Sequence, residues 1–136
     1  MSESFFRVSL IPFEPHTGGD DPMPVKRRLR DAILAKSGPL AIEEATRRLG
    51  GKKLRVDVSF MLWAGRPDLT DTRGKKDLDN LLKPLLDTLQ GRLDSDGKEA
   101  GLGIITNDDL ICEIRARKDI VREDAAEGMT LEIYAL

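Results

Sequence analysis

Two aspartates, Asp77 and Asp79, stand directly before a leucine pattern with the spacing of an amphipathic helix. In an extended lead-in to that helix, residues two apart project to the same side, about 6.6 Å apart along the chain. Two carboxylates placed in this way can converge on a hard cation, and Mg²⁺ favours one or two carboxylates together with water and a substrate phosphate. The alternative is a single helix-capping aspartate with an incidental acidic neighbour.

A lysine follows this acidic pair at helical spacing. Lys83 lies four residues after Asp79. If the helix begins at this aspartate, Asn80, Lys83 and Asp87 share a polar stripe opposite the leucines. A lysine beside a bound metal ion can contact the scissile phosphate of a substrate and neutralise the negative charge that develops there. The alternative is a solvent-facing lysine paired with an acidic residue one turn away.

A second acidic motif, Asn-Asp-Asp at 107–109, precedes a predicted strand. Asparagine and aspartate are also ordinary turn residues, so this motif alone does not indicate a site. Taken jointly, Asp77, Asp79 and one aspartate of the motif would form a three-carboxylate cluster beside Lys83. Such a cluster suits metal-dependent hydrolysis of a phosphodiester, with Mg²⁺ or Mn²⁺ as the ion.

The two stretches KKDLDNLLKPLLDTL and ITNDDLICEIRARK together resemble the RusA family of crossover junction endodeoxyribonucleases, which are Holliday junction resolvases. The shared pattern begins with an Asp-x-Asp-Asn helix start and a lysine three residues after the Asn. An Asp-Asp pair follows, before a strand that ends in a basic residue. The matching region runs from Lys75 to Lys118.

The resemblance implies a small subunit that works as a homodimer, binds branched DNA at a four-way junction and cuts opposite strands with Mg²⁺. Such an activity belongs to DNA recombination and repair. By position, the resemblance assigns Asp77, Asp79 and Asp109 as essential metal-binding carboxylates and Asp108 as a further metal ligand. It assigns Lys83 as the catalytic lysine.

The net charge of −2 conceals a strongly basic middle section. Residues 23–76 hold 14 Lys and Arg against 6 Asp and Glu, whereas residues 77–136 hold 7 against 14. A section this basic indicates an anionic partner, although solvated helix faces would have the same composition. The predicted DNA contacts are the basic residues nearest the two motifs: Arg73, Lys75, Lys76, Arg117 and Lys118. Arg117 has an alternative role, because it can pair with acidic residues of the sheet.

Composition excludes several classes of protein. The chain of 136 residues is predicted to form a single domain over 1–136. One cysteine, Cys112, and one histidine, His16, cannot form an intrachain disulfide or a four-ligand zinc site. We expect Cys112 to lie in the core, on the apolar side of a strand. Apolar runs are too short for a membrane span and no signal peptide is evident, so we expect a cytoplasmic protein with no membrane association.

Hydrophobic periodicity predicts an α+β fold, a two-layer mixed β-sheet with helices in the RusA-like order β-α-α-β-α-β-β. In the last predicted helix, Asp79 is the expected N-cap and Pro84 is expected to kink the helix or delay its start. The predicted strands lie at 5–13, 53–63, 110–118 and 128–136, and the predicted helices at 25–36, 39–49 and 77–90.

The function predicted from these observations is a Mg²⁺-dependent, structure-specific endodeoxyribonuclease that resolves four-way junctions. Two alternatives stay open. The first is a non-catalytic DNA-binding module with the same fold, and the second is a nuclease that acts on other branched DNA.

Overall fold

A computed structural model describes residues 4–17, 21, 23–66, 77–90 and 101–136. The order of elements in this part of the chain confirms the predicted order. The elements are β1 (Ser4–Leu10), α1 (Met23–Ser37), α2 (Pro39–Leu49), β2 (Leu54–Trp63), α3 (Leu78–Leu89), β3 (Ile111–Val121) and β4 (Gly128–Ala135), with short 3-10 turns η2 (Asp108–Leu110) and η3 (Asp124–Ala126).

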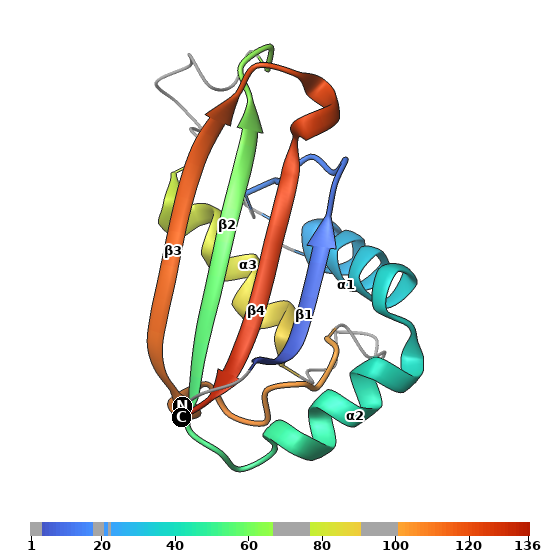
Figure 1. Cartoon of the computed structure of the whole chain (residues 1–136), viewed down its shortest axis with the longest axis vertical. Helices are drawn as coiled ribbons and strands as arrows, with labels where there is room; N and C mark the ends of the chain where they lie inside the picture. Colours follow the sequence, from blue (N-terminus) through green and yellow to red (C-terminus); the bar gives the residue numbers. More distant parts are fainter. Residues whose placement is uncertain (1–3, 18–20, 22, 67–76, 91–100) are drawn as a thin grey trace.

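The strands form one mixed four-stranded sheet in the order β1-β4-β2-β3. Strand β4 runs antiparallel to both β1 and β2, whereas β3 runs parallel to β2. A parallel pair needs a crossover connection, and α3 lies within the connection from β2 to β3. All three helices of the described part lie on one face of the sheet, as Figure 1 shows.

Strand β2 explains why one face is covered and the other is open. Its residues alternate between buried and half-exposed along the whole strand. The buried set of Leu54, Val56, Val58, Phe60 and Leu62 faces the helices, as the alternation of the sequence predicts. Of the intervening positions, Arg55, Asp57 and Ser59 carry polar side chains to the opposite face, which no helix of the described part covers. The core is therefore a single layer between sheet and helices.

The helix α3 is amphipathic as predicted, but two details differ. Asp77 is the N-cap, with extended backbone, and Asp79 lies in the first turn, so the prediction of Asp79 as the N-cap was wrong. Pro84 does not delay the helix, which begins at Leu78. Proline lacks only its own N–H, so a single backbone bond, to the carbonyl of Asn80, is lost. The Thr88 hydroxyl in turn donates to the Pro84 carbonyl at 2.7 Å.

Strand β3 corrects the prediction for Cys112, which is exposed rather than in the core. The strand lies at the edge of the sheet, so the helix layer covers its apolar side only in part. A shift of register opposite Leu54 and Arg55 also displaces the start of β3 from the expected alternation. Edge position depends on strand order, which the local pattern does not encode.

Candidate functional site

The segment after residue 100 fixes the position of the second acidic motif. The last carbonyls of a helix have no partner within the helix and need one elsewhere. Here the N–H of Leu102 donates to the Thr88 carbonyl at 2.7 Å, and the N–H of Ile105 donates to the Leu89 carbonyl at 2.9 Å. Leu102 and Ile105 are themselves buried in the core. The chain leading to residue 107 is thus held against the end of α3.

Gly101 permits this close approach. A Cβ atom at Gly101 would lie 1.6 Å from the carbonyl oxygen of Gln90, which no side chain can tolerate. Only glycine lets the returning chain pass so near the helix end. The glycine therefore contributes to placing the acidic turn beside α3.

The acidic turn itself is shaped by Asn107. The Asn107 side-chain oxygen accepts a hydrogen bond from the backbone N–H of Asp109 at 3.0 Å. Asparagine is an ordinary turn residue, and this hydrogen bond is typical of such a turn. The carboxylates of Asp108 and Asp109 are exposed. The asparagine is thus a positioning residue for the two aspartates.

A groove of about 230 Å³ joins the two acidic motifs. From α3 it receives Asp79, Lys83 and Asp87, which follow one flank of the helix at intervals of four residues. From the turn η2 it receives Asp108. We call this the α3 groove, and its lining residues are Asp79, Leu82, Lys83, Leu86, Asp87, Gln90, Asp108 and Ile111.

Two of the predicted carboxylates do not line the α3 groove. Asp109 lies next to Asp108 on η2, and Asp77 lies just before α3. The side chain of Asp77 makes no capping hydrogen bond to the helix, so its oxygens are not used in holding the helix end. Over the described ranges, no three His, Cys, Asp or Glu side chains are grouped closely enough to hold a metal ion. The three-carboxylate cluster expected from the sequence is therefore not assembled in this structure.

The donor chemistry of the α3 groove nevertheless fits a magnesium ion. Mg²⁺ takes oxygen ligands and is commonly held by one or two carboxylates, with waters and substrate phosphate completing the octahedron. Asp79 comes from the first acidic motif and Asp108 from the second, and both carboxylates line the same groove. Such a set suits an ion that binds together with its substrate, and does not suit a closed protein cage.

The charged side chains of the α3 groove find no charged partner among the described residues. In the parts of the chain that the structure covers, no ion pair forms at Asp79, Lys83, Asp87 or Asp108. Asp79, Lys83 and Asp108 are exposed, and Asp87 is half-buried against the leucine side chains. Their charges are free to act on a ligand.

A charge network around one buried carboxylate was not predicted from the sequence. Glu127, only 4% exposed, accepts two hydrogen bonds from the Arg66 guanidinium at 2.7 and 2.9 Å. Arg66 also pairs with Glu14 at 3.3 Å, and Arg28 donates to the Glu14 backbone carbonyl. Burial lowers the pKa of Arg28, while the Glu14 and Glu127 carboxylates act to raise it. We call Glu14, Arg28, Arg66 and Glu127 the Arg66 network.

The predicted DNA contacts fall into two groups. Arg73, Lys75 and Lys76 lie outside the described residues. Arg117 is exposed on β3 and pairs with Asp119 of the same strand at 3.0 Å, while Lys118 is exposed on the other side of β3. The alternative prediction for Arg117 was an ion pair with an acidic residue of the sheet. Arg117 does form such a pair, but with a residue of its own strand instead of a neighbouring strand.

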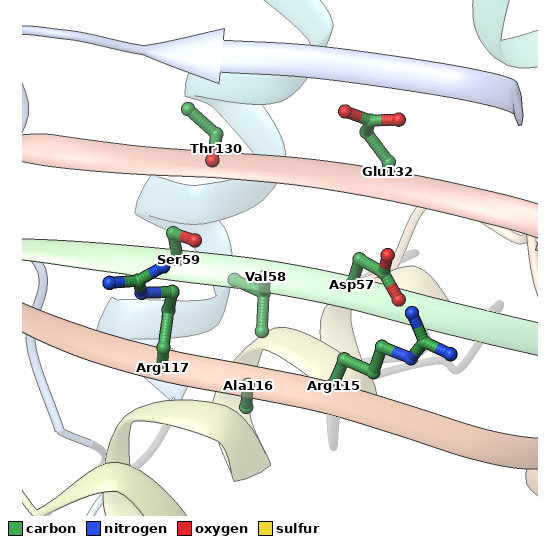
Figure 2. Close-up of a pocket in the computed structure, with 8 residues that line it drawn as sticks. All are labelled: Asp57, Val58, Ser59, Arg115, Ala116, Arg117, Thr130 and Glu132. Carbon is green, nitrogen blue, oxygen red and sulfur yellow. The ribbon is translucent and has the colours of Figure 1, made fainter.

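The open face of the sheet holds a second, polar hollow of about 340 Å³ (Figure 2). Asp57 of β2 and Glu132 of β4 lie side by side in its floor, since they are register partners. Arg115 and Arg117 of β3 project over the same face. The polar positions of β2, at alternate residues, were the signal in the sequence that could have revealed this surface.

Comparison with known proteins adds no identification. No protein-family model matches the chain, and no curated protein matches its sequence. Over the described residues, no helix is both long and apolar enough to pass through a lipid bilayer.

Proposed function

We propose that the protein is a Mg²⁺-dependent endodeoxyribonuclease of the RusA type that cuts branched DNA, with the four-way junction as its principal substrate. The proposal depends on one observation above all. Two separate motifs, which together resemble that family, contribute Asp79, Lys83 and Asp108 to a single groove. A homodimer that presents two such grooves to one junction completes the proposal.

In the proposed mechanism, Asp79 and Asp108 would hold the ion with oxygen ligands. Asp77 and Asp109 lie outside the α3 groove and would become ligands only if their side chains turned toward it. A bound magnesium ion supplies an activated water and stabilises charge on the phosphoryl oxygens. Lys83, one helical turn after Asp79, contacts the non-bridging oxygens of the scissile phosphate. Its ammonium group neutralises negative charge as the phosphoryl group passes through the transition state.

The apolar part of the groove has a supporting role in this mechanism. Leu82 and Leu86 lie between the acidic residues along α3 and also contact the core. Their packing fixes the helix face, so the spacing between Asp79, Lys83 and Asp87 does not depend on a ligand. A site held on a rigid helix maintains its geometry better than a site built on loops alone.

One observation favours the second candidate, a non-catalytic module that binds DNA junctions. The described residues do not bring three metal-ligating side chains together. A binding module would retain the fold and the exposed basic side chains of β3 without needing such a group. The two candidates differ in whether the DNA is cut.

The test is cleavage of a synthetic four-way junction, compared with a fork, a flap and a linear duplex, each with Mg²⁺ or with a chelator. We expect paired cuts in the junction that require Mg²⁺. Asp79→Asn should lower the cleavage rate at least about 100-fold and leave junction affinity within a few-fold, because the carboxylate acts in the transition state.

The matched control is Asp31→Asn, which neutralises an exposed aspartate of α1 that pairs with the adjacent Arg30 at 3.1 Å. This variant should cut at the normal rate. Normal cleavage by Asp79→Asn would refute the assigned site. Tight junction binding by the wild type, with no cutting of any substrate, would support the binding module instead.

A further inference from the structure

The two edges of the sheet are built differently. At one edge, β1 is flanked by α1 and α2 (Figure 1). The side chains of β1 and these helices line two hollows there. At the other edge, β3 has β2 on one side only, and nothing in the described part of the chain pairs with its outer side. An unpaired edge presents a row of backbone N–H and C=O groups, which is a template for another strand. With 11 residues, β3 is also the longest strand.

The side chains of β3 show which strand would suit this edge. Ile114 and Ile120 are 42% and 57% exposed, although they are large and apolar. Both belong to the side of the strand that faces the helix layer, since their register partners on β2 are buried. They lie three residues before and three residues after Arg117. This symmetry matters because an antiparallel pair of identical strands matches residues at equal distances from its centre.

We propose that a second copy of the chain pairs with β3 in an antiparallel arrangement, with the two-fold axis at Arg117. In this register Ile114 faces Ile120 of the second copy, twice by symmetry. On the open face, Arg115 faces Asp119 of the second copy, also twice. The two sheets then continue into one another through an isologous contact.

Neighbouring registers are less favourable. A two-fold axis at Ala116 sets Ile114 against Lys118 and Arg115 against Arg117, so it exposes apolar surface and opposes like charges. An axis at Arg115 sets that residue against its own copy and leaves Ile120 beyond the paired region. The axis at Arg117 also brings two arginines together. Each of them pairs with Asp119 of its own strand at 3.0 Å, and this carboxylate is then shared with Arg115 of the other copy. Of these three registers, only the axis at Arg117 sets the two exposed isoleucines against each other and also sets opposite charges against each other.

This inference does not depend on the proposed nuclease activity. The resemblance implies a homodimer but specifies no surface, whereas the exposed isoleucines and the charge order of β3 assign one. The test accordingly uses the full chain without DNA or metal. Molecular mass is measured by sedimentation across a wide range of protein concentrations.

We expect the wild type to be a dimer and Ile120→Lys to raise its dissociation constant at least about 100-fold, because each substitution acts twice across the axis. The matched control is Leu40→Lys, an equally apolar residue that is 80% exposed on α2, and it should remain dimeric. Circular dichroism of each variant checks that the fold is retained. A wild type that is monomeric throughout, or an Ile120→Lys variant that dimerises as the wild type does, would overturn the proposal.

A charge swap tests the register. Asp119→Arg should weaken the dimer, since it places an arginine opposite Arg115 of the second copy. The double variant Arg115→Asp with Asp119→Arg should restore dimerisation, because each new aspartate then faces a new arginine. Failure of the double variant to recover the dimer would overturn the register. A monomeric protein that still cuts junctions would refute this interface and the homodimer of the proposed function, and would leave the nuclease assignment of the α3 groove standing. A dimer that cuts nothing would support the interface and refute the nuclease.

Discussion

The Arg66 network and the α3 groove both bring together charged side chains from distant parts of the chain. In the network these charges are paired with one another, and in the groove they are not. In the network, Glu127 is buried and each of its oxygens accepts a hydrogen bond from Arg66. In the groove, Asp79, Lys83 and Asp108 are exposed and make no ion pair within the described residues. Charges that the fold has already neutralised are structural, whereas unneutralised charges grouped in a groove are available to a ligand.

The largest expected effect comes from a groove residue and concerns activity. Lys83→Met should lower the rate of junction cleavage by about 100-fold to 1000-fold, the range seen when one preorganised donor to a transition state is removed. Its free energy of unfolding should change by no more than about 0.5 kcal/mol, since the side chain is exposed. Single-turnover kinetics and urea denaturation measure the two quantities.

Lys53→Met is the matched control for Lys83→Met, because Lys53 is an exposed lysine just before β2. It should leave both quantities unchanged. If Lys83→Met destabilised the protein and left cleavage intact, the contrast between the groove and the network would fail.

The second effect comes from the network and concerns stability. Arg66→Met removes both hydrogen bonds that the guanidinium donates to the buried Glu127 carboxylate, so the free energy of unfolding should fall by about 3 kcal/mol. The double variant Arg66→Met with Glu127→Gln should recover part of this loss, because a neutral amide then replaces the buried carboxylate. Urea denaturation of the single and double variants measures the coupling. A loss as small as that of an exposed ion pair would contradict the structural role of the network.

The smallest effect concerns a half-buried pair on the open face. The Tyr134 hydroxyl donates a hydrogen bond to Glu132, and this bond, with some loss of solvent and the nearby Glu132 charge, raises the pKa of Tyr134. The stability that the bond contributes is present below the ordinary pKa of tyrosine and is lost as pH rises through the raised value. Glu132→Ala should return the pKa of Tyr134 toward its ordinary value.

Ultraviolet absorbance of the tyrosinate follows this titration without interference, because Tyr134 is the only tyrosine of the chain. Circular dichroism at the same pH values checks that the protein is still folded while the phenol ionises. An unchanged titration curve in Glu132→Ala would show that Glu132 does not control the tyrosine.

The hydrophobic periodicity of the sequence was enough to predict most of the helices and strands. The buried residues of β2 and the bounds of α2 match the prediction, because alternation and helical spacing act over neighbouring residues. The same logic failed for Cys112, whose exposure follows from the place of β3 in the strand order. It failed again for the N-cap of α3, where two aspartates two residues apart are equally good capping residues by type.

The candidate site could be predicted only in part. The two motifs indicated Asp79, Lys83 and Asp108, which the structure places in one groove. The sequence did not reveal how the turn is held there, because the contacts of Gly101 and Leu102 with the end of α3 are specific to the tertiary structure. Nor did it reveal the pairing of Arg66 with Glu127, which are 61 residues apart.

The central claim is that the carboxylates of the α3 groove bind a divalent ion next to a lysine. Titration calorimetry of Mg²⁺ and Mn²⁺ tests it directly, with wild type and Asp79→Asn compared in the presence of the same four-way junction so that ion uptake by the DNA cancels. The account predicts saturable uptake by the wild type that Asp79→Asn loses. Equal heats for the two proteins, with no uptake beyond that of the DNA, would contradict it.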